Sequence, residues 1–94
     1  MITAIVLITA ERGALPKLGE TLAGVAGVSE VYSVTGDIDF VAMVRAREHD
    51  ELADIVTRRI AQVPGVARTQ THVAFKAYSR HDLESMFAVG ADKP

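Results

Sequence analysis

The stretch Val25-Ala26-Gly27-Val28 recurs further along the chain as Val63-Pro64-Gly65-Val66. The same offset carries the apolar run Ala4-Ile5-Val6 onto Ala42-Met43-Val44. A segment that returns at a fixed offset usually marks one supersecondary unit that is used twice. The sequence therefore predicts two similar strand–helix–strand halves, one after the other.

The first half begins with a strand and continues into an amphipathic helix. Residues 2–9 are rich in β-branched side chains and too short for a typical helix, and Glu11-Arg12-Gly13 ends them with turn residues. Pro16 suits a first helical turn, and Gly27 is a stop signal. The apolar residues between them recur at helical spacing and form one face: Leu15, Leu18, Leu22 and Val25.

A hairpin, a second helix and a last strand follow. Residues 28–35 and 40–47 flank the turn residues Gly36-Asp37, so we expect them to pair as strands. A helix that begins at Glu48 or Asp50 is predicted to end at Pro64-Gly65. The last strand, residues 66–76, is expected to place Thr69, Thr71, Val73 and Phe75 on one face and Arg68, Gln70, His72 and Lys76 on the other.

The order strand, helix, strand, strand, helix, strand is that of a ferredoxin-like βαββαβ sandwich, an α+β fold. We expect this domain to occupy residues 1–77. Residues 78–94 are predicted to form a C-terminal extension with a frayed end. Ser79 and Asp82 resemble a weak capping box there, and Leu83, Met86 and Phe87 form a one-sided stripe on a short helix.

The second face of the predicted sheet has nothing to cover it. Two helices cover one face, yet the first and third strands are apolar on both. An exposed patch of this kind usually marks an association surface. The simplest closure is a homodimer packed sheet to sheet, a dimeric α+β barrel. The alternative is that the stripe at Leu83, Met86 and Phe87 folds back over the sheet, but one helix about 10–12 Å wide covers too little.

Composition excludes several classes of function. With 94 residues the chain is one domain, and its net charge of −2 argues against a nucleic-acid-binding surface. The absence of cysteine excludes disulfides, thiolate nucleophiles and cysteine-ligated metals. The first residues lack a signal-peptide pattern, which favours the cytoplasm. The longest apolar stretch, Ala4–Ile8, is too short to span a bilayer.

Catalytic and metal-binding patterns are weak. The three histidines have no metal-like partner at short spacing and are expected to be solvated, so we predict no metal and no cofactor. Nucleophile-elbow, Walker and zinc-protease motifs are absent from the sequence. Among candidate acid–base pairs, His72 with Asp39 is the best. The sequence thus predicts a protein that is not an enzyme.

The turn Thr35-Gly36-Asp37-Ile38-Asp39 is the most unusual stretch in the chain. It has an ordinary interpretation, in which Gly36 and Asp37 make a hairpin turn and Asp39 is a capping or solvent-exposed residue at the start of the next strand. In a functional interpretation, backbone N–H groups near Gly36 hold a carboxylate and Asp39 pairs with an ammonium group, which together match an amino acid. Thr69 and Thr71 are either plain strand residues or hydroxyls that orient a polar ligand.

Two linked motifs resemble the ligand-sensing domain of the Lrp/AsnC family of transcription regulators. Residues 30–40 contain the family's VTG-x-(Y/F)-D turn, with Ile38 in place of the usual aromatic residue, and residues 60–71 contain its PGV-x-R-T-x-T strand. The similarity spans about residues 2–76. It implies a ferredoxin-like fold, dimers joined through their sheets, frequent assembly into octamers, and small effectors, typically amino acids, bound between dimers. By motif, the ligand-binding residues would be Gly36, Asp37, Asp39, Thr69 and Thr71.

Full-length members of that family carry a helix-turn-helix before the sensing domain, whereas Met1 here opens directly on the first strand. The resemblance therefore implies a stand-alone effector-binding module that co-assembles with full-length regulators. Two alternatives stay open. One is a small dimeric α+β barrel enzyme, of isomerase or monooxygenase type, and the other is a purely structural oligomerisation domain.

Overall fold

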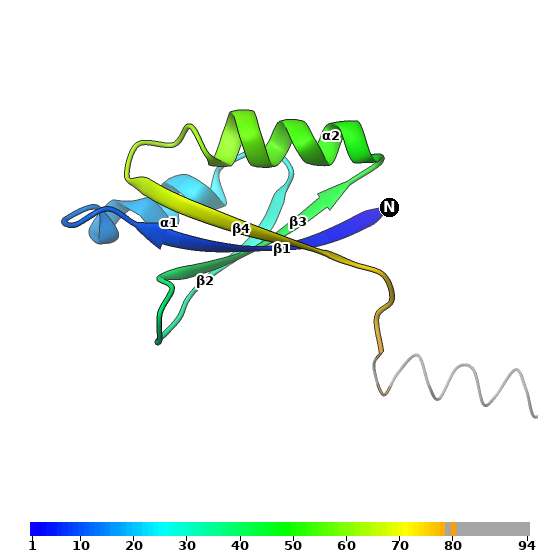
Figure 1. The fold of residues 1–94 in the computed structure, drawn as a ribbon, viewed down its shortest axis with the longest axis horizontal. Coiled ribbons are helices and arrows are strands. Elements are labelled where there is room, and N and C mark those ends of the chain that lie inside the picture. The colour runs from blue at the N-terminus through cyan, green and yellow to red at the C-terminus, as the bar shows by residue number, and fades with distance from the viewer. Residues whose placement is uncertain (79, 81–94) are drawn as a thin grey trace, which may run out of the picture.

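The computed structural model describes residues 1–78 and residue 80. Its elements follow the predicted order and confirm the ferredoxin-like α+β fold (Figure 1). The strands are β1 (Ile2–Ala10), β2 (Val28–Ser33), β3 (Phe40–Ala46) and β4 (Val66–Ala74). The helices are α1 (Leu15–Ala23), α2 (His49–Asp54) and η1 (Ile55–Ile60), which continues α2 as a π-helix.

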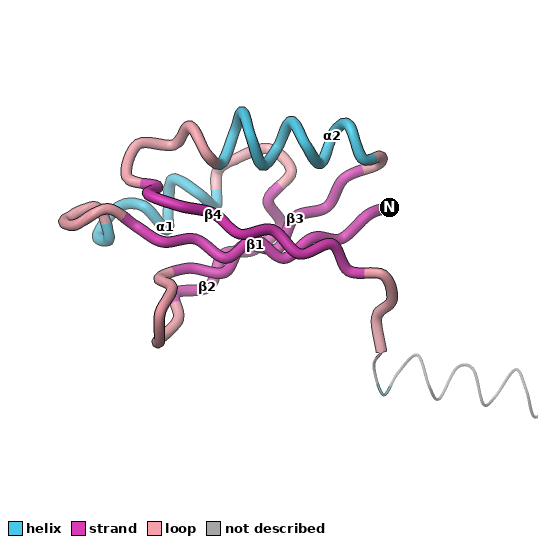
Figure 2. Tube along the Cα trace, viewed as in Figure 1, coloured by secondary structure: helices cyan, strands magenta, loops and turns pink. Residues whose placement is uncertain are grey.

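The four strands form one antiparallel sheet in the order β2-β3-β1-β4. The central strands are the first of each half, and every pair of neighbours joins a strand of one half to a strand of the other. Figure 2 shows the sheet as a twisted layer with α2 running above it. Both helices contribute to a single core on one side of the sheet.

Strand register decides which residues enter that core. Ala4, Val6 and Ile8 of β1 are fully buried, and their partners in β3 are buried with them. Because successive side chains of a strand point to opposite faces, this alternation is the one the sequence predicts. The helices complete the core with Leu18, Leu22, Leu52, Ile55 and Ile60.

The alternate residues of the same strands lie on the other side of the sheet, here called the open face. Ile5 and Leu7 pair with Met43 and Val41, and all four are half-buried. The open face comprises Thr3 to Thr9 at odd positions in β1, Val41, Met43 and Arg45 in β3, Glu30 and Tyr32 in β2, and Arg68, Gln70 and His72 in β4. The described helices pack on the opposite side, so residues 1–78 present an apolar sheet surface here.

Two glycines allow the halves to pack closely against each other. Gly27 has a φ of +100°, and a Cβ there would lie 2.4 Å from Ile55 Cδ1 in the second half. Gly65 has a φ of +101°, and a Cβ there would lie 2.8 Å from Ala14 Cβ in the first half. Both positions need glycine for its backbone conformation and for the close approach. The repeated sequence therefore marks reciprocal contacts between the halves.

The second helix differs from the regular α-helix that the periodicity predicts. From Ile55 onward it is π-helical, and the Ala61 N–H donates to Val56 O at 3.0 Å. Ile55 and Ile60 stand five residues apart, which is the spacing of π-helical hydrogen bonds, and both are fully buried. The wider turn thus directs both isoleucines into the core.

The strand ends also differ from expectation. β2 ends at Ser33 and β4 at Ala74, so Phe75, predicted to share a strand face with Thr69 and Thr71, lies beyond the strand and is fully exposed. The predicted stripe at Leu83, Met86 and Phe87 lies outside the described residues. Within the part of the chain that is described, no helix has the length and apolar character needed to cross a membrane.

Candidate functional site

The turn between β2 and β3 is fixed by Asp39. Its carboxylate Oδ2 accepts the Ala10 N–H at 2.7 Å, and its own N–H donates to Ile8 O at 2.9 Å. The Val34 N–H donates to Asp39 O at 3.1 Å and closes the turn. A carboxylate that accepts a backbone N–H forms one of the stronger hydrogen bonds in proteins. Asp39 therefore holds the turn against the end of β1.

Gly36 and Asp37 form the exposed tip of this turn. Gly36 has a φ of +111°, and a Cβ added there would meet nothing within 4 Å. The glycine is thus explained by its backbone conformation and not by close packing. Asp37 is exposed beside it.

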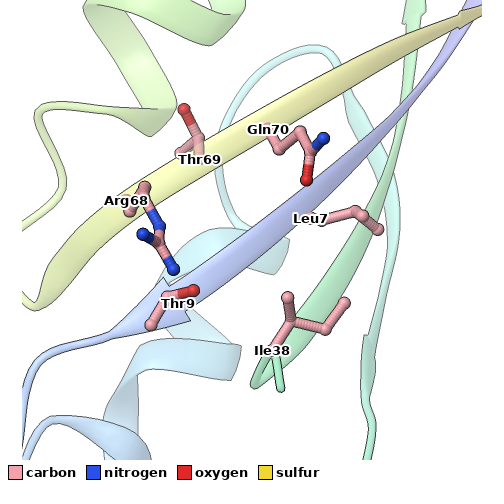
Figure 3. Close-up of a pocket in the computed structure, with 6 residues that line it drawn as sticks. All are labelled: Leu7, Thr9, Ile38, Arg68, Thr69 and Gln70. Atoms are coloured by element: carbon pink, nitrogen blue, oxygen red, sulfur yellow. The ribbon is translucent and has the colours of Figure 1, made fainter. Parts of the chain in front are cut away.

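The two threonines of β4 lie on the helix side of the sheet. Thr69 pairs with Ile8 and Thr71 with Val6, both of which are core residues, and the threonines are half-buried. In Figure 3 the Thr69 hydroxyl points away from the Arg68 guanidinium. The structure therefore does not bring Thr71 to the turn, and it places Thr69 at the border of the site.

A pocket of about 310 Å³ opens beside the turn, at one end of the open face (Figure 3). It is built on neighbouring strands, because Leu7 pairs with Gln70 and Thr9 with Arg68 across β1 and β4. The turn contributes its one apolar residue, Ile38. The lining consists of Leu7, Thr9, Ile38, Arg68, Thr69 and Gln70.

The chemistry of the pocket combines one cation, neutral polar groups and apolar side chains. Figure 3 shows Arg68 beside the Thr9 hydroxyl, with Gln70 and Leu7 following along the strands. The Arg68 guanidinium has no hydrogen bond or ion pair with any other residue in 1–78. A free guanidinium beside apolar walls suits a small molecule that carries a carboxylate and an aliphatic chain.

Sequence reasoning did not name four of the residues that line this pocket, which are Leu7, Thr9, Arg68 and Gln70. The signal was present in the strand alternation, which places Arg68 and Gln70 on the face opposite Thr69. Thr69 and Thr71 were chosen because they belong to the family motif, without regard to which face of the sheet they occupy.

The acid–base pair proposed for an enzyme does not form. His72 pairs with Ile5 from the β4 side of β1, whereas Asp39 bonds to Ile8 from the β3 side. Three residues along a strand span roughly 10 Å, which is beyond hydrogen-bond reach. No group of three or more His, Cys, Asp or Glu side chains within the described residues could hold a metal ion.

Comparison with known proteins gives the family. The sequence model of the Lrp/AsnC ligand binding domain matches residues 3–83. The chain belongs to the Lrp/AsnC family. Curated relatives of this Lrp/AsnC domain include the HTH-type transcriptional regulator FL11 of Pyrococcus horikoshii, 31% identical over 75 residues, with 80% of this chain and 49% of FL11 covered. The chain thus spans about half the length of FL11. It covers 39% of a second relative, the HTH-type transcriptional regulator PF0250 of Pyrococcus furiosus.

Solved structures agree with the Lrp/AsnC assignment. A protein from Thermus thermophilus is 50% identical, with a TM-score of 0.78, and the match covers 85% of this chain and all of that one. The feast or famine regulatory protein of M. tuberculosis, in complex with L-methionine, is 27% identical, with a TM-score of 0.73, and the match covers 85% of this chain and 54% of that one.

Proposed function

We propose that this Lrp/AsnC domain is an effector-binding oligomeric module of transcriptional regulation that acts in the cytoplasm and binds an amino acid in the pocket beside the turn. The observation that carries the proposal is the pocket itself, where the Arg68 guanidinium, which has no side-chain partner among residues 1–78, lies with the apolar side chains of Leu7 and Ile38. The M. tuberculosis relative, which was solved with L-methionine, supports an amino-acid ligand.

Each residue of the motif has a part in this proposal. Gly36, Asp37 and Asp39 shape the turn that carries Ile38 to the pocket, and Asp39 anchors it on Ala10. Thr69 borders the pocket from the helix side. Thr71 supports the strand one pair further along β1.

A thermal-shift titration against the twenty amino acids tests the ligand. A ligand at a hundred times its dissociation constant adds about 2.7 kcal/mol of stability, which raises the Tm of a domain this size by roughly 10–20 °C. We expect an aliphatic amino acid to give this shift, because Leu7 and Ile38 line the pocket. If none of the twenty changes the Tm, the proposed amino-acid site is wrong.

We also propose that the module is a homodimer joined through its open faces, and that dimers assemble further, up to octamers. Ile5, Leu7, Val41 and Met43 give the open face its apolar centre. On β2, the hydrogen bond from the Tyr32 hydroxyl to the Glu30 carboxylate raises the pKa of Tyr32. Tyr32 therefore stays neutral around pH 7, so the polar border of the open face adds no tyrosinate charge.

The 94-residue chain is expected not to bind duplex DNA specifically. Its net charge is −2, and the described helices pack on the sheet, leaving no recognition helix in the described residues. Fluorescence anisotropy at physiological salt should show no sequence-selective binding below micromolar concentration. Selective submicromolar binding would contradict the prediction. If the module does not bind DNA, as expected, its effects on transcription pass through a full-length Lrp/AsnC regulator, which should co-purify with it.

A further inference from the structure

A second pocket, here called the end pocket, lies at the end of the open face opposite the pocket beside the turn. Its volume is about 480 Å³. Three strands form its floor, since Thr3 of β1 pairs with Arg45 of β3 and with Ala74 of β4. Apolar side chains supply most of its lining, which consists of Met1, Thr3, Ile5, Met43, Arg45, Ala74, Phe75, Lys76 and Ala77.

The charge of the end pocket is positive. Arg45 and Lys76 line it, and no acidic residue does so among the described residues. The Arg45 guanidinium donates to the Thr3 hydroxyl at 2.9 Å, and Lys76 Nζ lies 5.2 Å from the centre of the Tyr78 ring. Neither cation forms an ion pair within residues 1–78. The end pocket therefore suits an occupant that combines apolar side chains with acidic ones.

Large apolar side chains are exposed at this end of the sheet. Among the described residues six such side chains are exposed, and four of them belong to the start of β1 or to the end of β4 and the residues after it. These four are Met1, Val73, Phe75 and Tyr78. Exposed apolar residues that gather in one place mark an association surface, whereas single ones do not.

The direction of the chain after β4 indicates where the remaining residues go. Figure 1 shows residues 75–78 turning to the side of the sheet opposite α2, which is the side of the open face. In a sheet-to-sheet dimer the second copy lies on that side. Between Gly65 and Gly90 the sequence contains no glycine and no proline, two of the residues that most often form tight turns. The chain is therefore directed toward the partner and not back onto its own sheet.

The sequence beyond residue 78 is complementary to the end pocket. Its predicted apolar stripe consists of Leu83, Met86 and Phe87. Asp82 and Glu84 flank the first member of that stripe. All of these residues lie outside the described part of the chain. The stripe matches the apolar lining, and the two carboxylates match the two cations of the pocket.

We propose that residues 79–94 are exchanged between the two subunits of the sheet-to-sheet dimer. The stripe of one subunit fills the end pocket of the other, and Asp82 or Glu84 pairs with the partner's Arg45. This inference rests on the proposed dimer, and it names what covers one end of the dimer interface. Each subunit gives one segment and receives one, as the two-fold symmetry of a homodimer requires.

Cysteine cross-linking tests the exchange, because the chain contains no cysteine of its own. Two single variants, Met43→Cys in the end pocket and Met86→Cys in the stripe, are mixed, allowed to exchange subunits and oxidised. Peptide mapping by mass spectrometry identifies which cysteines are joined. We expect a disulfide between positions 43 and 86, which can form only between two chains because neither chain carries both cysteines. In the control, Ala53→Cys, exposed on α2, replaces Met43→Cys and should give no such disulfide.

The dissociation constant of the dimer provides a second measurement that needs no cysteine. Phe87→Asp puts a charge where the stripe meets the pocket, and it should raise the dissociation constant of the full chain about 10- to 100-fold in analytical ultracentrifugation. Ser85→Asp is the matched control, because it adds the same charge at a position outside the stripe. It should leave the dissociation constant within about threefold of the wild-type value.

The outcomes separate the exchange from the dimer. If the protein is dimeric but positions 43 and 86 of different chains do not join, or if Phe87→Asp and Ser85→Asp dimerise equally well, the exchange is overturned and the dimer stands. If a double variant, Met43→Cys with Met86→Cys, forms the disulfide only within one chain, the segment packs on its own sheet and the exchange is wrong. If the wild-type protein is monomeric at micromolar concentration, the proposed dimer fails together with the exchange.

Discussion

Replacing Gly27 with alanine should remove a large part of the stability of the fold. The Cβ would lie 2.4 Å from Ile55 Cδ1 and 2.8 Å from Cγ1, so rotating the terminal methyl group does not relieve the contact. Ile55 is fully buried and has no room to move within a close-packed core. A positive φ costs a non-glycine residue roughly 1–3 kcal/mol, and overpacking costs roughly another 1–3 kcal/mol.

Together these two costs approach the free energy of unfolding of a typical domain, which is about 5–15 kcal/mol. Gly27→Ala should therefore lower the Tm by more than about 10 °C. Urea unfolding followed by circular dichroism measures the loss of stability. Gly13→Ala is the matched control, because Gly13 has a φ of +85° and its added Cβ would meet nothing within 4 Å. Equal losses in the two variants would show that the Gly27–Ile55 contact does not limit stability.

Replacing Ile5 with glutamate should convert the proposed dimer to monomers. Ile5 lies at the centre of the open face, paired with Met43, so a sheet-to-sheet interface would bury one carboxylate from each subunit. An unpaired buried charge costs roughly 3–5 kcal/mol, and two copies raise the dissociation constant by at least about a thousandfold. Light scattering after gel filtration should then give a 10.1 kDa species in place of the dimer.

Ala53→Glu provides the control, because Ala53 is exposed on α2, on the helix side of the sheet. It should leave the dimer intact. Circular dichroism should show that Ile5→Glu keeps its fold, since Ile5 is not part of the core. A wild-type protein that is monomeric at micromolar concentration, or an Ile5→Glu variant that stays dimeric, would contradict the interface.

The sequence predicted the elements because each has a local cause. Strand alternation separated the Val6 face of the first strand from the Ile5 face, and Gly27 marked the end of the first helix. The alternation did not say which of the two apolar faces enters the core; the structure shows that it is the Val6 face. The π-helical turn was not predicted, because hydrophobic periodicity over a few residues does not separate the two helix types. The end of β4 was also missed, because Phe75 has strand propensity but the chain leaves the sheet after Ala74.

The site was harder to predict than the fold. Motif similarity pointed to the turn between β2 and β3, and Ile38 of that turn lines the pocket. It could not show that Asp39 is held by Ala10, because that hydrogen bond joins residues 29 positions apart. Nor could it show that Arg68 reaches the turn end of the open face, since this depends on the pairing of β4 with β1.

The strand order also has a consequence for how the protein folds. Since β1 and β2 are not neighbours, and neither are β3 and β4, neither half can form a single pair of hydrogen-bonded strands on its own. The duplicated unit is therefore not an independent folding unit, and equilibrium unfolding should be one cooperative transition. During synthesis, β1 cannot complete its pairing with β4 until residue 74 has left the ribosome, because Thr3 pairs with Ala74. Two separately produced halves would each be unstructured, and mixing them should restore the sheet by complementation.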